Sequence, residues 1–506
     1  MKYLVDGNQM KTIDEYTMNQ VGIPSMVLME KAAMAVSNKM LEKIKLEDSI
    51  IAICGTGNNG ADGVAIARIL TTMGYSVDIL IIGDEKRGTE QFRQQLYIAR
   101  NLDVNVINNA KISEYNVVVD AIFGIGLSKP ISGAFACAIE EVNKNKNTVF
   151  SVDIPSGINT STGQIMDYAI RADYTVTFGY AKIGMILYPG CEYAGEVTIA
   201  DIGFAKKALK EVHPSTFTYD REDVKQLPVR EKYSNKGTFG RVLVIAGSTN
   251  MSGACFLSAK AAYRTGAGLV KILTVEENRG VIQAMLPEAI ISSYQPNNLK
   301  NKMEIDRITT EIQWATAIVF GPGMGISSAT DLLLDLVLKN AKVPVILDAD
   351  GLNILAAHKE YVCEDGEGIR EIDLPHNVII TPHLKEMSRL INSTTEYVKN
   401  NLMTIAKNVT KNKQFVLVLK DARTIVARED SYYVNTTGNN GMATGGSGDV
   451  LTGVIAGLLS NGLDTYDAAC YGVFVHGLAG DAAKETRGTY SLMAGDIIDG
   501  LSKVLP

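Results

Sequence analysis

Residues 439–449 have the sequence NNGMATGGSGD, and residues 450–457 continue it as VLTGVIAG. The second part is apolar, with small residues on one face, so we expect a helix whose N-terminus follows the glycine-rich stretch. Free backbone N–H groups and the positive end of the helix dipole make such a junction an anion site. Beside a bound phosphate, Asp449 would act as a general base toward a substrate hydroxyl. The simpler alternative is that Asp449 caps the helix.

The length and composition of the chain predict a globular protein of two domains. It has 506 residues, of which 46% are hydrophobic and 21% are charged, and this is too long for one ordinary core. The net charge is −7 and no lysine- or arginine-rich block is present, so we expect no nucleic-acid partner. The six cysteines include no CxxC pair, which argues against structural zinc and a disulfide framework. Without a signal-peptide core or a membrane-spanning apolar run, we expect a cytoplasmic protein with no membrane partner.

The N-terminal half alternates between strand and helix patterns. Two helices are expected within residues 10–41, hinged at 22–25, with Ser25 capping the second. A buried strand at 49–54 leads through the glycine-rich residues 55–63 into a helix at 64–73. Further strands are expected at 77–82, 115–120, 148–153, 175–178 and 196–200, with helices at 92–102 and 134–146. This alternation predicts a Rossmann-like, doubly wound parallel sheet with helices on both faces.

Three acidic residues of this half fall where such a sheet binds ligands. Asp120 and Asp153 end two of the expected strands, and Asp62 lies in the glycine-rich stretch beside Asn58 and Asn59. A single strand-end aspartate is often a turn former. Three acidic groups at one edge favour a site, because their oxygens suit a cation or a sugar.

The C-terminal half follows the same logic with different signatures. Strands are expected at 242–246, 269–275, 315–320, 343–347, 378–381 and 415–420, and a helix of small residues at 255–265. A polar or glycine-containing segment follows most of these strands, so these segments should share one edge of a parallel sheet. His383 and Lys420 lie at such strand ends. We expect His383 to contact the substrate and Lys420 to contact the nucleotide, and a purely structural role for His383 is equally open. His476, inside an apolar helix pattern, is expected to be a packing residue.

The N-terminal motifs resemble those of the NAD(P)H-hydrate epimerase family. They are GIPSMVLMEKAA at 22–33, GNNGADG at 57–63, VDAIFGIGL at 119–127 and DIPSGI at 153–158. The resemblance implies that Asp153 is catalytic and that potassium is bound by Asn59, Asp120 and Ser156. It also implies that the hydrated nucleotide is bound by Asn58, Asn59, Gly60, Ala61, Asp62, Gly124, Ile125, Gly126, Leu127, Ser128, Lys129, Pro130 and Asp153. Ala61 departs from the family pattern, which usually has glycine there. Hard oxygen donors with one carboxylate suit a large univalent ion.

The C-terminal motifs resemble those of the ADP-dependent NAD(P)H-hydrate dehydratases, a branch of the ribokinase-like superfamily. They are KGTFGR at 236–241, GPGMG at 321–325, DADGLN at 348–353, TPH at 381–383 and GSGDVLTG at 446–453. The resemblance implies Asp449 as the catalytic base, magnesium with the nucleotide, and contacts to the hydrate from Ala254, Gly323, His383 and Asp449. It implies nucleotide contacts from Lys420, Asp421, Ala422, Arg423, Thr424 and Gly448. Three positions depart from the family pattern. The family usually has a small residue where this chain has Leu384, and glycine where it has Lys385 and Asp421.

Together these features predict a bifunctional repair enzyme for hydrated nicotinamide nucleotides. An epimerase domain is expected at 1–212, a linker at 213–228, and a ribokinase-like α/β dehydratase domain at 229–506. The expected substrates are the hydrates of NADH and NADPH together with ADP, and a homo-oligomer is compatible with the composition. One alternative is a small-molecule kinase fused to a nucleotide-binding module. Another is that the N-terminal domain binds a partner without catalysing a reaction.

Overall fold

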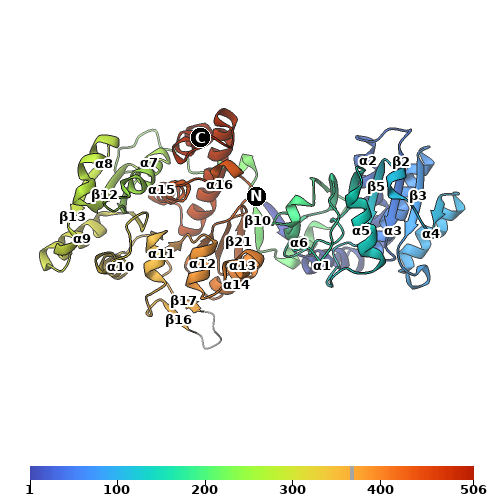
Figure 1. The fold of residues 1–506 in the computed structure, drawn as a ribbon, viewed down its shortest axis with the longest axis horizontal. Coiled ribbons are helices and arrows are strands. Elements are labelled where there is room, and N and C mark those ends of the chain that lie inside the picture. The colour runs from blue at the N-terminus through green and yellow to red at the C-terminus, as the bar shows by residue number, and fades with distance from the viewer. Residues whose placement is uncertain (365–369) are drawn as a thin grey trace. The chain divides into compact units, whose positions relative to one another are not determined.

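The computed structural model describes residues 1–364 and 370–506, and the chain folds as two compact units (Figure 1). The N-terminal unit comprises Tyr3–Pro214, and the C-terminal unit comprises Ser215–Pro506 with Met1–Lys2. Residues 213–228, expected as a linker, include β10 (Thr216–Thr218) and the 3-10 helix η5 (Arg221–Gln226). Within the described residues, no helix is long and apolar enough to cross a membrane.

The N-terminal unit contains a seven-stranded parallel sheet in the order β4-β3-β2-β5-β6-β7-β9. Its strands are β2 (Ser49–Cys54), β3 (Ser76–Ile81), β4 (Asn105–Ile107), β5 (Val117–Ala121), β6 (Thr148–Val152), β7 (Tyr174–Phe178) and β9 (Glu196–Ala200). Outside this sheet, β1 (Lys2–Val5) pairs in parallel with β8 (Ala181–Lys182), with Leu4 opposite Ala181. The strand order reverses between β2 and β5, and their carboxyl ends therefore flank a crevice of the kind that binds ligands.

Helices cover both faces of this sheet, as the doubly wound class requires. The helices are α1 (Gly7–Asn19), α2 (Ser25–Leu41), α3 (Asn58–Thr72), α4 (Glu90–Asn101), α5 (Ala134–Lys144) and α6 (Lys206–Val212). Ile50 and Ala52 of β2 pack with α2, α3 and α4, whereas the intervening Ile51 and Ile53 pack in the core that contains α5. The alternation of side chains along a strand thus supplies two cores, and the predicted fold class is confirmed.

Two helix starts differ from the sequence-based expectation. α3 begins at Asn58 and not at residue 64, so Asn58–Asp62 form its first turns. Gly60 does not break this helix, because its missing side chain lets it pack against the carbonyl of Gly55, where a Cβ would lie 1.8 Å from the oxygen. The expectation that Ser25 caps α2 is wrong: Pro24 is the cap residue and no side chain caps the helix.

The C-terminal unit contains a sheet in the order β13-β12-β11-β14-β15-β18-β19-β20-β21-β10. Neighbouring strands are parallel from β13 to β19. The strands are β11 (Arg241–Ile245), β12 (Leu269–Val275), β13 (Ile290–Tyr294), β14 (Ala317–Phe320), β15 (Val345–Leu347), β18 (Val378–Ile380), β19 (Val416–Leu419), β20 (Ile425–Arg428) and β21 (Ser431–Val434). β20 is antiparallel to both its neighbours, which the strand-helix alternation did not predict. β16 (Val362–Glu364) and β17 (Arg370–Ile372) form a separate antiparallel pair.

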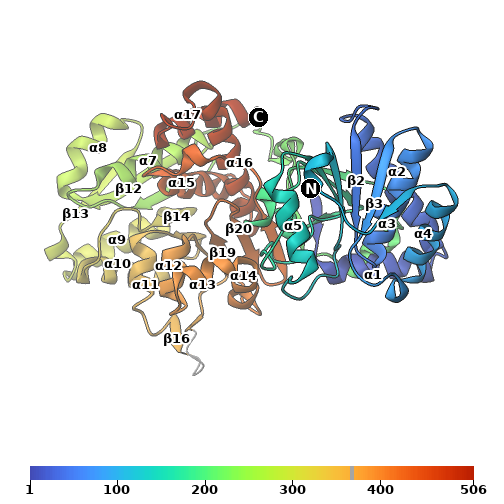
Figure 2. The same cartoon turned by 45° about the vertical axis from the view of Figure 1, so that its right-hand side comes forward.

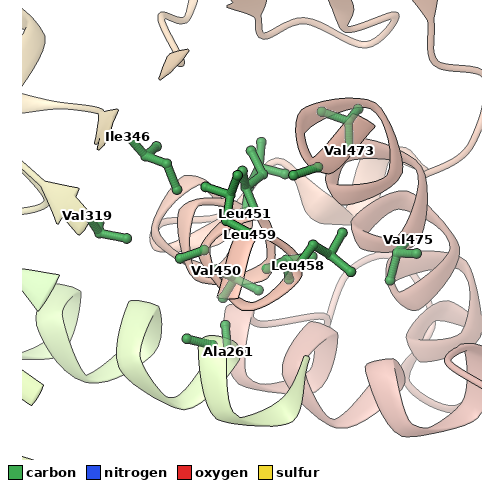
Figure 3. Packing of buried hydrophobic residues seen from close by; sticks show 14 of the residues in the cluster. Ala261, Val319, Ile346, Val450, Leu451, Leu458, Leu459, Val473 and Val475 are labelled. Carbon is green, nitrogen blue, oxygen red and sulfur yellow. The ribbon is translucent and has the colours of Figure 1, made fainter. Parts of the chain in front are cut away.

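One face of this sheet packs against a layer of four helices (Figure 2). They are α7 (Ser252–Arg264), α15 (Ser447–Ser460), α16 (Thr465–Arg487) and α17 (Ala494–Val504). Figure 3 shows Val450 and Leu458 of α15 between Ala261 of α7, Val319 and Ile346 of the sheet, and Val475 of α16. α15 is therefore enclosed by apolar contacts, and its N-terminus is held at the edge of the sheet. The other helices are α8 (Arg279–Met285), α9 (Lys302–Trp314), α10 (Ser328–Asn340), α11 (Asp350–Leu355), α12 (Leu384–Leu390), α13 (Thr395–Asn400) and α14 (Leu402–Thr410).

Candidate active sites

The glycine-rich loop of the C-terminal unit ends at Gly446, which is the N-cap of α15 and has a left-handed backbone with φ of +88°. Glycine takes this conformation at little cost. At its other end the loop is anchored by the Asp481 carboxylate of α16, which accepts hydrogen bonds from the Gly438 amide at 3.0 Å and from Asn439 Nδ2 at 2.9 Å. Asp481 was not predicted as a site residue, because its partners lie some forty residues away in the chain.

Asp449 is the third residue of α15 and does not cap it, since no side chain makes a capping hydrogen bond at this helix start. Within the described residues its carboxylate has no hydrogen-bond partner. Burial raises the pKa of Asp449 to about 7, repulsion from Asp348 adds to the rise, and Lys420 opposes it. A carboxyl group that exchanges its proton near neutral pH is suited to general-base catalysis.

A buried ion pair lies beside Asp449. Lys420 Nζ is 2.6 Å from Asp348 Oδ1, and Asp348 is 1% exposed. Gly448 packs closely on the pair, because a Cβ at this glycine would lie 3.3 Å from Lys420 Nζ and 3.6 Å from Asp348 Oδ2. The structure therefore brings together three residues that were predicted as site residues, Gly448, Asp449 and Lys420. Asp348, which was not singled out as a site residue, completes the group; its signal was the DADGLN motif at a strand end.

His383 lies next to this group at the N-cap of α12. Its backbone pairs with that of Lys420, and its Nδ1 accepts the N–H groups of Lys385 and Glu386 at 3.1 and 3.3 Å. Burial lowers the pKa of His383, and Lys420 lowers it further. Because Nδ1 is an acceptor here, the ring is neutral. Leu384 and Lys385, which depart from the family pattern, are thus accommodated in the first turn of this capped helix.

The two remaining expected hydrate contacts of this unit adjoin each other. Gly323 has a φ of +59°, and a Cβ there would lie 2.8 Å from the Cβ of Ala254 in the first turn of α7. The loop of Gly323 is tied to the sheet edge by Asp350 Oδ2, which accepts the Gly325 amide at 2.8 Å.

The expected nucleotide contacts at 421–424 form the turn between β19 and β20. Thr424 Oγ1 donates to the carbonyl of Asp421 at 3.0 Å, and Arg423 donates to the carbonyl of Thr436 at 3.3 Å. Ala422 is exposed on this turn. The turn follows Lys420 directly and so lies at the same edge. His476 is buried in α16, as a packing residue should be, and burial lowers its pKa to about 4.

The N-terminal unit has a cavity of about 1130 Å³ at the crevice between β2 and β5. The predicted residues on its wall are Asn58, Asn59, Asp62, Gly124, Ile125, Gly126, Leu127, Ser128, Lys129 and Asp153. Gly60, Ala61 and Pro130 do not line it. Gly60 packs against the Gly55 carbonyl, and Ala61 is fully buried in the core of the unit. Pro130 is exposed beyond the end of the lining segment.

The three predicted potassium ligands lie at the end of β5 and around it. Asp120 is 1% exposed, and its carboxylate accepts the Ser156 hydroxyl at 2.5 Å, the Ser156 amide at 2.8 Å and the Ser151 hydroxyl at 2.7 Å. Burial raises the pKa of Asp120, and the hydrogen bonds from Ser156 oppose this. Within the described residues no cationic side chain pairs with Asp120. A buried carboxylate without a counter-charge, bonded to the Ser156 hydroxyl, fits a bound monovalent cation.

Asp153 is held in a left-handed backbone conformation with φ of +67° at the end of β6. Its Oδ1 accepts hydrogen bonds from Lys182 Nζ at 2.5 Å, from Thr177 Oγ1 at 3.1 Å and from the Phe178 amide at 3.1 Å. Lys182 and Asp14 both line the cavity, and neither was predicted. Lys182 lies in a stretch with no motif, and Asp14 looks like an ordinary polar residue of an amphipathic helix.

The fold and the two sites define a two-unit α/β protein with a Rossmann-like and a ribokinase-like unit. Residues 242–503 match the family model described as NAD(P)H-hydrate dehydratase, and residues 25–184 match the model described as YjeF-related protein N-terminus. The bifunctional NAD(P)H-hydrate repair enzyme Nnr of Thermofilum pendens is 34% identical over 98% of this chain and 95% of its own length. The same enzyme of Moorella thermoacetica is 35% identical over 99% of this chain and 96% of its own length.

The chain belongs to the family of bifunctional NAD(P)H-hydrate repair enzymes, as its motifs predicted. A solved structure of the ADP/ATP-dependent NAD(P)H-hydrate dehydratase of Bacillus subtilis, co-crystallised with ATP and Mg²⁺, is 32% identical. It covers 57% of this chain and 96% of its own, with a TM-score of 0.49.

Proposed function

We propose that the chain repairs hydrated nicotinamide nucleotides in two steps. The N-terminal unit interconverts the R and S hydrates of NADH and NADPH. The C-terminal unit dehydrates the S form, using ADP and releasing AMP and phosphate. The observation that carries the proposal is the Asp449 carboxyl, with its pKa of about 7, beside the glycine-rich start of α15 and the Lys420–Asp348 pair.

The dehydration follows from the chemistry of the leaving group. Hydroxide leaves poorly, but phosphate leaves readily when the neighbouring ring nitrogen supplies electrons. Asp449 takes the proton from the substrate hydroxyl, the oxygen attacks the terminal phosphorus of ADP, and AMP departs. The backbone N–H groups at the start of α15 hold the transferred phosphoryl group. Loss of phosphate from the hydroxyl carbon and of a proton from the adjacent carbon then restores the double bond.

Two ions support these sites in the proposal. Magnesium bound with the nucleotide phosphates would neutralise part of their charge. Asn59, Asp120 and Ser156 would hold potassium, whose charge would offset that of the buried Asp120 carboxylate. The loop and helix ends that bind the hydrate then stand in a defined position relative to Asp153.

We infer that each activity belongs to one unit, and that within the predicted range of 205–228 a cut between Pro214 and Ser215 separates them without cutting β10 or η5. Each unit has its own core and its own site, so each should fold alone. A cytoplasmic location, a homo-oligomer and the absence of nucleic-acid and membrane partners remain predictions.

The deciding experiment incubates the purified chain with a mixture of R and S NADH hydrate, ADP and magnesium, and follows the dihydronicotinamide absorbance. Full recovery, faster than spontaneous epimerisation allows, is the expected result. Recovery of only the S fraction would remove the epimerase and favour a non-catalytic N-terminal module. No recovery, together with phosphorylation of hydroxymethyl-pyrimidine or thiazole alcohols by ATP, would instead identify a small-molecule kinase.

A further inference from the structure

The charged groups on the wall of the N-terminal cavity come from several elements. They are Lys11, Asp14 and Glu15 of α1, Asp62 of α3, Lys129 of the loop after β5, Asp153 at the end of β6, and Lys182 of β8. Burial raises the pKa of the Cys54 thiol in β2, and the charges of Asp120 and Asp62 raise it further. Three of these carboxyl groups, on Asp14, Asp62 and Asp153, interact with one another.

Lys182 fixes one of the three carboxyl groups. The lysine is fully buried, and Nζ donates to Asp153 Oδ1 at 2.5 Å, Thr177 Oγ1 at 2.7 Å and the Phe178 carbonyl at 3.1 Å. These bonds use all three ammonium protons. All the hydrogen bonds that Asp153 accepts within the described residues go to Oδ1, so Oδ2 is left free to act on a ligand. Burial lowers the pKa of Lys182, whereas the charge of Asp153 opposes this.

Asp62 and Asp14 have the opposite environment. Within the described residues, neither carboxyl group makes a hydrogen bond or an ion pair. Burial raises the pKa of Asp62 well above its usual range, and the charges of Asp153 and Asp14 raise it further. Burial also raises the pKa of Asp14, with Asp153 as the next cause. One carboxyl group held by a lysine, beside two that have no cationic partner, is an arrangement that can divide a reaction between a base and an acid.

We propose that epimerisation uses Asp153, positioned by Lys182, as the general base and Asp62, on the same cavity wall beside Asp14, as the general acid. The assignment rests on the proposed epimerase function. The hydroxyl-bearing carbon of the hydrate is bonded to the ring nitrogen. Asp153 removes the hydroxyl proton, the oxygen forms a C=O bond, the C–N bond breaks, and the nitrogen takes the proton of Asp62.

The ring then closes in the reverse sense. Rotation about the adjacent C–C bond presents the other face of the aldehyde to the nitrogen. The nitrogen attacks this face, its proton returns to the Asp62 carboxylate, and Asp153 returns the other proton to the oxygen. The centre is inverted, no atom is oxidised or reduced, and the substrate keeps its own oxygen.

The pH profile of epimerisation tests the two positioning residues in the full chain. Lys182→Met should lower kcat more than it changes KM, and should move the acid limb of kcat/KM to higher pH by at least about one unit. Thr177→Val removes one hydrogen bond to the same Asp153 oxygen without removing a charge, so it should move this limb less. Equal shifts in the two variants would overturn the role of Lys182. If Lys182→Met does not fold, Lys182→Met/Asp153→Asn removes both charges together, and a wild-type rate in this variant would overturn the base.

The role of Asp62 as the general acid is tested on the basic limb of the pH profile. Asp62→Asn should slow epimerisation at least about 100-fold. Asp14→Asn should keep its activity at low pH. As the pH rises, its activity should fall earlier than that of the wild type, because Asp62 loses its proton more easily without the charge of Asp14. Glu140→Gln, at a carboxyl on α5 that pairs with Lys144 and does not line the cavity, is the control and should leave the basic limb in place. A basic limb that Asp14→Asn leaves unmoved would overturn this assignment.

Oxygen labelling tests the chemical step in the wild-type chain. With H₂¹⁸O as solvent, ring opening predicts inversion that is faster than label uptake. One ¹⁸O gained per inversion would show that hydroxide leaves and water returns, and would overturn the mechanism. A wild-type chain that does not epimerise at all would instead overturn the proposed function, and dehydration of the S hydrate in the same sample shows that the chain is folded.

Discussion

Lys420 and Asp348 form an ion pair of 2.6 Å at the carboxyl end of the C-terminal sheet, with only 2% of the Asp348 side chain exposed. Both members of the pair interact with Asp449: Asp348 raises the pKa of its carboxyl group and Lys420 lowers it. The protonation of the proposed base therefore depends on a contact between residues seventy-two positions apart.

Lys420→Met should destabilise the C-terminal unit by about 3–5 kcal/mol, because it leaves the Asp348 carboxylate buried without its counter-charge. The pKa of Asp449 should rise above about 7, since the opposing lysine is gone. Calorimetry of the full chain measures the first effect. The double variant Lys420→Met/Asp348→Asn is the control and should regain most of the stability; equal losses in both variants would contradict the explanation.

Asp449→Asn should abolish dehydration while nucleotide binding is retained. In the wild type, kcat/KM for the S hydrate should rise with pH up to about 7 and then level off, because the base must be deprotonated and burial raises its pKa to about 7. Rates with S hydrate and ADP between pH 5.5 and 8.5 give the profile. If the variant stays within about tenfold of the wild type, a barrier change of only ~1.4 kcal/mol, Asp449 is not the base.

The same carboxyl should cost stability at high pH. The folded-state pKa of Asp449 is raised from 3.8 to about 7, so the folded state holds the proton more tightly than the unfolded one. Its stabilising contribution is complete below the unfolded value and disappears as the pH rises through the folded value. The free energy of unfolding of Asp449→Asn should therefore exceed that of the wild type by an amount that grows between pH 4 and pH 7.5, toward a limit of about 4 kcal/mol. The difference in Tm should grow over the same range. A constant difference over this range would contradict the linkage.

Gly453→Ala should destabilise the C-terminal unit by about 1–3 kcal/mol, because overpacking forces backbones apart. A Cβ at Gly453 of α15 would lie 2.2 Å from the Ser258 carbonyl of α7. Gly495 of α17 is the matched control: nothing lies within 4 Å of its added Cβ, so Gly495→Ala should stabilise by roughly 0.5–1 kcal/mol. Calorimetry of both variants decides, and effects of the same sign would refute the packing argument.

Replacing potassium with tetramethylammonium should lower the Tm of the N-terminal unit and slow epimerisation. The proposed ion would offset the charge of the buried Asp120 carboxylate, which pairs with no cationic side chain within the described residues. Asp120→Asn should bind the ion more weakly and recover partly at high potassium. Asp78→Asn is the control, since Asp78 in β3 bonds to Tyr115 and Asn105 instead. Equal behaviour in potassium and sodium would remove the ion from the site.

Local sequence signals predicted both sheets and the chemistry at their edges. Buried strands such as β2 and β12 are short apolar runs, and helices such as α7 have their own period, so their alternation requires parallel sheets. The position of Asp449 followed from the glycines before it. Asn58 was placed in a loop because glycine weakens an isolated helix, whereas at Gly60 a close backbone contact outweighs that preference.

The residues that were missed act through long-range contacts. Lys182 reaches back to Asp153, Asp348 meets Lys420, and Asp481 meets Asn439 only once the chain has folded. No spacing in the sequence marks these pairs. The β20–β21 hairpin was missed for a related reason: its strands are short and antiparallel, and no helix precedes them to signal a new unit.

The Asp481 carboxylate makes the entry to the glycine loop part of a rigid scaffold. Its two hydrogen bonds attach Gly438 and Asn439 to α16, a helix buried along most of its length. A loop fixed before its ligand arrives loses little conformational entropy on binding, and the affinity for an anion is higher for that reason. Asp481→Ala should therefore weaken nucleotide binding mainly through entropy, with a smaller change in binding enthalpy. Substitutions around His383 and Gly323 could then alter the range of substrates without rebuilding the anion site.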